Sequence, residues 1–282
     1  MQNLASIIIP IYGNFDKKRL DIVKESILQQ KGLDVEIILP DEKQIKPPIN
    51  CSKLINQGYS ISKGNFVYIS DADVVLASNT FLGDAAEYSQ KNGNLILTRP
   101  KMRRLLLEDW EWFQELFKSD GIASLQKLDF SQEHLVTPFN KPRQIKVFKK
   151  FENGRLKTFI ASQKDFEEYI SDDNHQGEEP KYWNQERHCG GTFLTRNQFK
   201  RVGGYCEQFI GWVCWDADFQ WKLKSLFEAD YFPEECSFEV IHLDHSKEYF
   251  DKQKWEHDKK LQELRRNLGA MKCSEYDKVG DY

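Results

Sequence analysis

Two carboxylates stand just after an apolar run near residue 70. The run at 66–69 is aromatic and β-branched and follows Gly64 and Asn65, a pattern that predicts a buried strand. Asp71 and Asp73 come soon after it, with one small residue between them. Because ligands of open α/β sheets bind beyond the carboxyl ends of strands, two acids there suit a divalent cation and the phosphate that it carries. The alternative is a solvated acidic turn.

The elements that must position these acids alternate along the first third of the chain. Runs of β-branched and apolar residues at 6–9, 35–39 and 66–69 predict strands, and amphipathic stretches at 16–30 and 51–62 predict helices. Strand–helix alternation with short links indicates a parallel sheet with Rossmann-like winding. We therefore predict an α/β fold with a mixed, mainly parallel sheet flanked by helices.

Several of these motifs, in this order, resemble the family 2 glycosyltransferases and their GT-A relatives. Ile7-Ile8-Ile9-Pro10-Ile11-Tyr12 resembles the first strand of that family. Asn56-Gln57-Gly58 and Lys63-Gly64-Asn65-Phe66 resemble its approach to the third strand, and Ser70-Asp71-Ala72-Asp73 falls where the family carries its DxD motif. The resemblance implies a GT-A fold.

The C-terminal half carries a second group of motifs. Gly190-Gly191-Thr192-Phe193, Val202-Gly203-Gly204-Tyr205 and Gly211-Trp212, followed by Asp216-Ala217-Asp218, resemble β-1,4-galactosyltransferases and bacterial chondroitin-polymerase-type enzymes. The resemblance covers roughly residues 6 to 245, apart from an irregular middle. It implies an enzyme that moves a sugar, galactose or N-acetylgalactosamine, from a UDP-sugar to a hydroxyl. The implied acceptor is a glycan, a lipid-linked sugar or a peptide, and the implied outcome is inversion.

The same resemblance implies a division of the chain. Residues 1–248 would form the GT-A domain, made of a nucleotide-binding half at 1–98, an irregular acceptor-side region at 99–187 and a catalytic half at 188–248. A helical tail at 249–282 would follow. Within the irregular region, Asn153-Gly154 between apolar stretches is a strong hairpin signal.

Roles for the donor site also follow from the resemblance. Asp73 would ligate Mn²⁺ or Mg²⁺, and Asp71 would contact the ribose. A late histidine would complete the coordination, with His242 preferred and His245 as the alternative; a histidine ligand favours Mn²⁺. A structural role for the histidine stays open.

Further donor-binding residues are implied at strand ends and in loops. They are Pro10, Ile11, Tyr12, Asp41, Asn56, Ala72, Gly191 and Trp212. Asp41 falls where the family places an acid that contacts uracil, although a turn residue after Pro40 is the alternative.

Asp216 is the predicted general base. An acceptor hydroxyl must lose its proton as it attacks the anomeric carbon, and a carboxylate within hydrogen-bond reach can take that proton. The alternative makes Asp216 the N-cap of a helix that begins near Ala217, and both roles are compatible because a helix N-terminus stabilises an ionised acid. Trp212 and Trp215 can stack on sugar rings or pack in the core.

Two positions depart from the family pattern. Trp215 stands where the family has Glu, which bears on acceptor binding. Ile55 stands where the family commonly has Arg, which bears on the grip on the base or diphosphate, and Arg99, Lys101 or Arg103 could compensate. Two other functions stay open. A sugar nucleotidyltransferase would need a glycine-rich basic loop after the first strand, where the chain has Tyr12-Gly13-Asn14-Phe15. A catalytically inactive nucleotide-sugar or glycan-binding module is the second.

Bulk composition bounds the partners. A net charge of −4 without a long basic block argues against a general nucleic-acid binder. The six cysteines form no Cys-x-x-Cys pair, which argues against zinc and for reduced thiols. With no leader peptide and no apolar stretch near the roughly 20 residues that span a bilayer, we expect a cytoplasmic protein.

The charged tail leaves a membrane question open. Trp255, Leu261, Leu264 and Leu268 alternate there with Lys and Arg. Such a helix can lie on the anionic inner membrane surface, near a lipid-linked acceptor, or pack its apolar stripe on its own domain.

Overall fold

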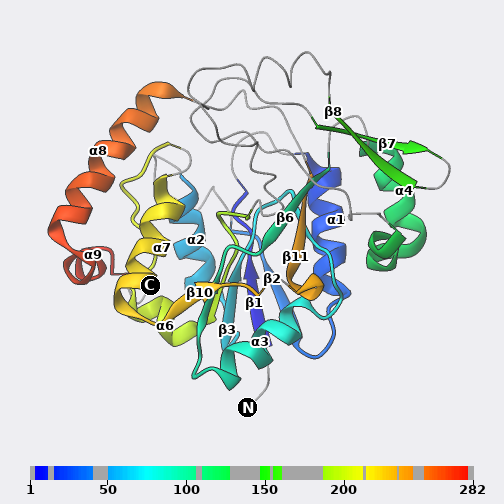
Figure 1. Cartoon of the computed structure of the whole chain (residues 1–282). Helices are drawn as coiled ribbons and strands as arrows, with labels where there is room; N and C mark the ends of the chain where they lie inside the picture. The colour runs from blue at the N-terminus through cyan, green and yellow to red at the C-terminus, as the bar shows by residue number, and fades with distance from the viewer. Residues whose placement is uncertain are drawn as a thin grey trace, which may run out of the picture.

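The structure is a computed structural model. It describes residues 4–11, 16–40, 50–105, 110–127, 147–152, 155–160, 187–211, 214–233, 235–243 and 251–278. Figure 1 shows strands in the centre of the molecule, helices around them, and the C-terminal helices α8 and α9 at the outer edge.

Six of the described strands form the main sheet, in the order β10-β5-β9-β3-β1-β2. Strand β9 runs antiparallel to both of its neighbours, β3 and β5, and the other pairs are parallel. The predicted mixed, mainly parallel sheet is therefore confirmed. The strands are β1 Leu4–Ile8, β2 Asp34–Ile38, β3 Phe66–Ile69, β5 Ile96–Thr98, β9 Thr192–Thr195 and β10 Ala229–Tyr231.

Two smaller sheets accompany it. Strands β4 (Val74–Leu76), β11 (Glu239–Leu243) and β6 (Lys101–Leu105) form one, with β11 antiparallel to β4 and parallel to β6. Strands β7 (Val147–Glu152) and β8 (Arg155–Ile160) pair antiparallel. That pair confirms the hairpin predicted from Asn153-Gly154, although those two residues lie outside the described ones.

The described helices include those predicted at 16–30 and 51–62, and several begin with a side-chain cap. Asp16 caps α1, Asn50 caps α2, and Thr195 and Gln198 form a capping box at α6. The α-helices are α1 Lys17–Leu28, α2 Cys51–Ile61, α3 Phe81–Lys91, α4 Trp110–Asp120, α6 Arg196–Arg201, α7 Cys214–Leu226, α8 Lys252–Leu268 and α9 Ala270–Tyr276. Short 3₁₀ helices cover Gly121–Lys127 and Cys236–Phe238.

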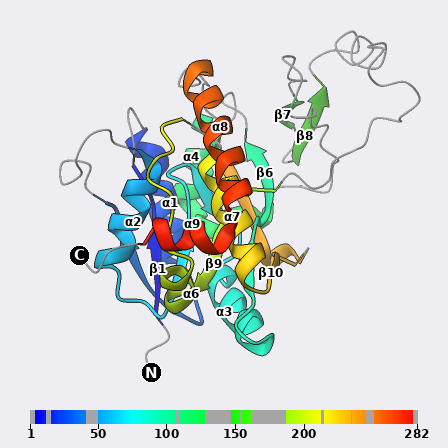
Figure 2. The ribbon, with the colours of Figure 1, turned by 90° about the vertical axis from the view of Figure 1, so that its left-hand side faces the viewer.

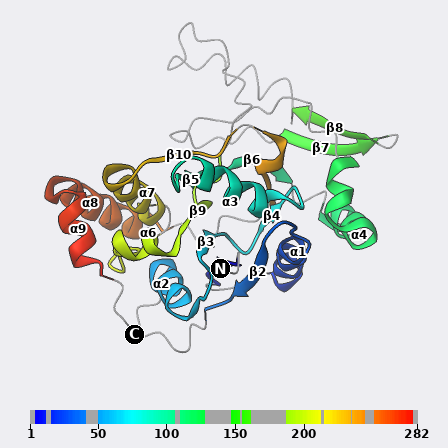
Figure 3. The ribbon, with the colours of Figure 1, turned by 90° about the horizontal axis from the view of Figure 1, so that it is seen from below.

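The main sheet is apolar on both faces. Because side chains alternate along a strand, Phe66 and Tyr68 of β3 join one core cluster, with α1, α3 and the second sheet. Val67 and Ile69 join the other, with α2, α6 and α7. Figure 3 shows these two groups of helices on opposite sides of the strands. Burial on both faces explains why the strand sequences are continuously apolar.

The Asn-x-Gly motif owes its glycine to packing. A Cβ atom at Gly58 would lie 2.6 Å from Cγ2 of Ile8 on β1 and 3.0 Å from Cγ of Pro40. Helix α2 can therefore approach the sheet this closely with a glycine at this position.

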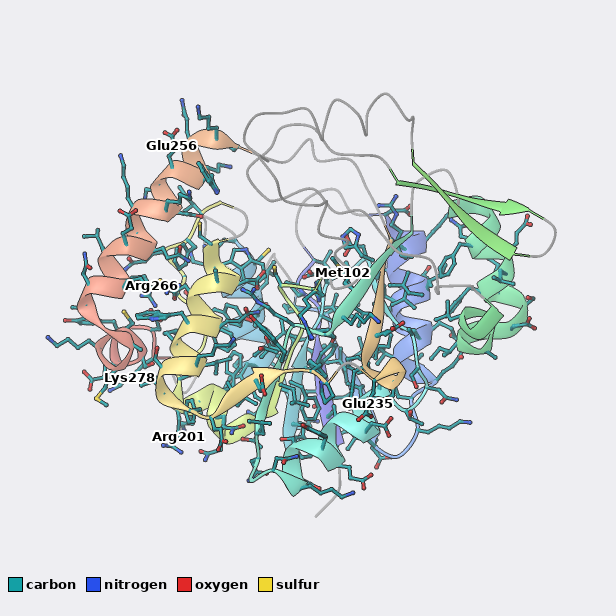
Figure 4. All side chains as sticks on the ribbon, viewed as in Figure 1. Met102, Arg201, Glu235, Glu256, Arg266 and Lys278 are labelled. Carbon is teal, nitrogen blue, oxygen red and sulfur yellow. The ribbon has the colours of Figure 1, made fainter. Side chains whose placement is uncertain are left out.

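The C-terminal helices pack on α7, as Figures 1 and 2 show. Trp255 and Leu261 of α8 lie against the core cluster that contains Trp215 and Phe219 of α7. Figure 4 places Glu256 and Arg266 of α8 at the edge of the molecule and Met102 of β6 near its centre. The described helices include none with the length and apolar character to cross a membrane.

Candidate functional site

One edge of the main sheet collects the chemistry-bearing residues. Strand β3 ends at Ile69, which pairs with Thr192 at the start of the antiparallel strand β9. Thr98 at the end of β5 pairs with the same Thr192. The topology therefore brings three segments together: the acids after β3, residues 188–191 before β9, and Arg99 after β5.

Asp71 is tied to His188, a residue that sequence reasoning did not assign a role. His188 Nε2 and Asp71 Oδ2 are 2.7 Å apart, and His188 is 4% exposed. The backbone N–H of His188 donates to the Pro100 carbonyl over 2.9 Å, which fixes the segment. A Cβ atom at Gly190 would lie 3.0 Å from Asp71 Oδ2, so the glycine makes room for this pair. The signal in the sequence was the histidine's position just before the glycine pair.

Asp73 and His242 come together, as predicted. Val74 of β4 pairs with His242 of β11, and the N–H of Leu243 donates to the Asp73 carbonyl over 2.8 Å. This pairing puts Asp73 Oδ2 and His242 Nε2 at 3.7 Å from each other. Both side chains are partly exposed, at 19% and 12%.

The donor set of this pair fits a divalent cation. A carboxylate oxygen and an imidazole nitrogen are ligands that Mn²⁺ accepts, and Mg²⁺ favours the oxygen. Among the described residues no cluster of three or more acid, histidine or cysteine ligands occurs. Within the described ranges, Asp73 and His242 are thus two neighbouring side chains that could ligate a cation, and their ligation stays a prediction.

Asp216 lies in the first turn of α7, which begins at Cys214. The predicted start near Ala217 was therefore late, and Asp216 is not the N-cap. Its side chain is almost fully buried, and Oδ1 has no hydrogen-bond partner in the described part of the chain.

The surroundings of Asp216 disfavour its charged form. Burial raises the pKa of this carboxyl well above its ordinary value, the nearby Asp71 raises that pKa further, and Arg99 lowers it. A buried carboxylate with a raised pKa holds a proton more readily than an exposed one, and such groups cluster at functional sites.

Cys51 and Tyr205 both interact electrostatically with Asp71 and Asp216. Burial raises the pKa of the Cys51 thiol, and Asp71 and Asp216 raise it further. The same three causes raise the pKa of Tyr205. Since the thiolate is the nucleophilic form, Cys51 is held protonated and unreactive beside Asp71 and Asp216.

Asn56 acts within the scaffold of the site. Its Oδ1 accepts the N–H of Tyr205 and its Nδ2 donates to the Tyr205 carbonyl, both over 2.9 Å. Nδ2 also donates to Glu207 Oε1 over 2.9 Å, and the side chain is buried. This geometry makes Asn56 a residue that positions Tyr205, while its predicted contact with the donor stays a prediction.

The remaining predicted residues are spread around the same edge. Pro10 is buried at the end of β1, and Ile11 and Ala72 are half-buried against the first core cluster. A Cβ atom at Gly191 would lie 2.5 Å from Cδ of Pro100, so this glycine also permits a close approach. Tyr12, Asp41, Trp212 and His245 lie outside the described residues.

Trp215 belongs to the core. It is 5% exposed, and its ring centroid lies 5.5 Å from that of Tyr205. Of the two predicted alternatives for Trp215, packing in the core is therefore the one that its burial fits.

Comparison with known proteins gives matches among solved structures. No protein-family model and no curated protein matches the sequence. The chain is similar to the catalytic domain of Drosophila β1,4-galactosyltransferase 7 in complex with xylobiose, at 12% identity and a TM-score of 0.46, covering 92% of this chain and 80% of that chain. It is also similar to a mutant of the Drosophila protein in complex with manganese, UDP-Gal and xylobiose, at 12% identity and a TM-score of 0.43, covering 90% and 79% of the two chains.

Proposed function

We propose that this chain is a metal-dependent glycosyltransferase that moves a sugar from a UDP-sugar to an acceptor hydroxyl with inversion. One observation carries the proposal: a single sheet edge joins the acids after β3 to a buried carboxylate that has no partner for Oδ1 in the described part of the chain. Asp71 and Asp73 supply the donor side, and Asp216 supplies the acceptor side. A structural acidic turn would not explain a buried acid with a raised pKa beside it.

On the donor side, Asp73 and His242 would hold Mn²⁺ or Mg²⁺. When bound there, the cation would supply Lewis-acid stabilisation of the charge on the diphosphate. Asp71, oriented by His188, would contact the ribose of the UDP-sugar. The two carboxylates would therefore have different roles, Asp73 at the metal and Asp71 at the ribose, although only one residue separates them.

On the acceptor side, Asp216 takes the proton. As the acceptor oxygen bonds to the anomeric carbon, its proton passes to the Asp216 carboxylate. The bond between that carbon and the diphosphate oxygen breaks, and UDP leaves with the electron pair. Attack from the face opposite the diphosphate inverts the configuration at the anomeric carbon.

The identity of sugar and acceptor follows from the motif resemblance. Galactose or N-acetylgalactosamine is the proposed sugar, and a glycan, a lipid-linked sugar or a peptide is the proposed acceptor. The proposal extends to peripheral contact with a membrane through the tail, because Leu264 and Leu268 of α8 are exposed at 67% and 40%. Flotation of the protein with anionic liposomes tests that contact, and no co-flotation would remove it.

The test of the function is a donor screen. UDP release is measured for a panel of UDP-sugars with Mn²⁺ and with candidate acceptors. We expect release from UDP-galactose or UDP-N-acetylgalactosamine that depends on both metal and acceptor. UDP binding without turnover for any donor would instead identify a binding module, and the absence of UDP binding would contradict the proposal.

A further inference from the structure

Arg99 adopts a backbone conformation that arginine rarely takes. Its φ is 53°, in the left-handed region, where a side chain with a Cβ atom is strained. Asn94, with a φ of 64°, is the other non-glycine residue of this kind in the described part of the chain, and asparagine tolerates the region well. Glycine would fit position 99 without strain, so the arginine side chain must contribute something that glycine cannot.

Three hydrogen bonds hold Arg99 at the corner between β5 and β6, and a fourth anchors its partner Gln220. Its N–H donates to the Gly191 carbonyl over 2.8 Å, and its carbonyl accepts from Arg187 Nη1 over 3.1 Å. Its Nε donates to Oε1 of Gln220, whose Nε2 in turn donates to the Cys189 carbonyl. The guanidinium is thereby fixed to α7 and to the segment before β9.

This anchoring puts the positive charge on the Asp216 side of α7. Gln220 follows Asp216 by four residues, so both side chains lie on one face of the helix. The guanidinium of Arg99 lowers the pKa of Asp216, whereas burial and Asp71 raise it. Cys51 of α2 and Tyr205 also interact with the Asp216 carboxylate, and burial keeps both of them protonated.

We propose that Arg99 is a positioning residue for the transfer reaction and that its guanidinium is the counter-charge that keeps Asp216 available as a base. The inference rests on the proposed function of Asp216. This role also gives a reason for an arginine with a left-handed backbone at position 99. The hydrogen bond to Gln220 places its charge beside α7.

The test combines Arg99→Gly, Arg99→Lys and Asp216→Asn. The unfolding free energies of the wild type and Asp216→Asn are compared by denaturant titration between about pH 5 and pH 9, because their difference follows the protonation of Asp216. The same comparison in the Arg99→Gly background is expected to show Asp216 titrating on the order of one pH unit higher. This readout needs neither substrate nor turnover.

Kinetics give the second readout. We expect Arg99→Gly to bind UDP with Mn²⁺ like the wild type, and its transfer rate to rise at a higher pH than that of the wild type, because Asp216 loses its proton later. Arg99→Lys keeps the charge and should recover part of the rate. Asn94→Gly removes the other left-handed side chain, which precedes β5 whereas Arg99 follows it, and controls for backbone relief without an expected change in rate.

Three outcomes separate this inference from the proposed function. An unchanged Asp216 titration in Arg99→Gly overturns the inference, even where Asp216→Asn abolishes transfer. Weaker UDP binding with an unchanged titration also overturns it, because Arg99 would then be a donor ligand. A shifted titration in a protein that transfers no sugar supports the Arg99–Asp216 pair and contradicts the glycosyltransferase function.

Discussion

Helix α7 carries two buried carboxylates, Asp216 and Asp218, on different sides, and their surroundings differ. Asp216 and Gln220 face the strand ends, whereas Asp218 and Lys222 face α8 and α9. Asp218 accepts two hydrogen bonds of 2.9 Å from Arg265, while Asp216 Oδ1 has no partner within the described residues. A paired buried acid supports the fold. One left without a partner costs stability and is retained where it does chemistry.

The paired side is a closed network of charges. Arg265 bonds both Asp218 and Asp277, with Nη1 donating to Asp277 Oδ1 over 2.9 Å. Lys222 donates to Asp277 and to the Gly204 carbonyl, the latter over 2.6 Å. Two cations and two carboxylates thus balance among α7, α8 and α9. This network holds α7 against α8 and α9, and it therefore also holds in place the helix that carries Asp216.

The largest expected effect comes from changing Asp216 while the Asp218 network stays intact. Asp216→Asn keeps the shape of the side chain but removes the proton acceptor, so we expect the transfer rate to fall on the order of 10²–10⁴-fold. UDP affinity should stay unchanged, because we place the donor at Asp71 and Asp73. UDP release at saturating donor and acceptor measures the rate, and wild-type turnover in this variant would show that the base is another residue.

The same variant should be more stable than the wild type at neutral pH. Because the pKa of Asp216 is raised in the folded state, the folded protein binds more protons than the unfolded one between the two pKa values. Wild-type stability therefore falls as the pH rises through that window. Asparagine removes this loss, and the advantage of Asp216→Asn should vanish below about pH 4, near the unfolded pKa. Denaturant titrations at several pH values check the sign.

The next largest effect comes from breaking the ion pair between Asp218 and Arg265. Asp218→Ala leaves the charge of Arg265 buried with one partner fewer, which should lower the free energy of unfolding by about 3–5 kcal/mol. Glu256→Ala, an exposed acid on α8, is the matched control and should leave stability nearly unchanged. Urea unfolding measures both variants. Equal stabilities for the two would mean that the network does not hold α7.

The smallest effect concerns the hydrogen bond between His188 and Asp71. His188→Ala should weaken UDP binding about tenfold, the order expected for losing one hydrogen bond to a charged group. His257→Ala is the control, because His257 also contacts an aspartate, Asp258, but lies on α8 with 54% of its side chain exposed. Calorimetric titration with UDP and Mn²⁺ compares the two. An equal loss in both variants would contradict the role of His188.

Local patterns predicted the elements that carry the donor side. The apolar run at 66–69 matches β3, and the helix predicted at 51–62 matches α2, because strand alternation, helical periodicity and turn residues are local properties. Asp73 and His242 were both named as metal ligands from family resemblance and not from the physics of the sequence; they lie close together, and ligation stays a prediction.

The features that could not be predicted from the sequence depend on contacts between residues far apart in the chain. Strand β6 is basic and strand β10 has three residues, so neither shows alternation; they become strands through their partners β11 and β5. The role of His188 exists because β9 runs antiparallel beside β3. Arg99 needs its φ value and its contact with Gln220 to be recognised, and residue types reveal neither.

The most direct test of the account is calorimetric titration of UDP into three proteins, with and without Mn²⁺. We predict that the wild type and Asp216→Asn bind UDP equally well when Mn²⁺ is present, and that Asp73→Ala does not. Binding by Asp73→Ala at wild-type affinity, or no binding by the wild type under either condition, would contradict the assignment of this edge of the sheet as a metal-dependent UDP-sugar site.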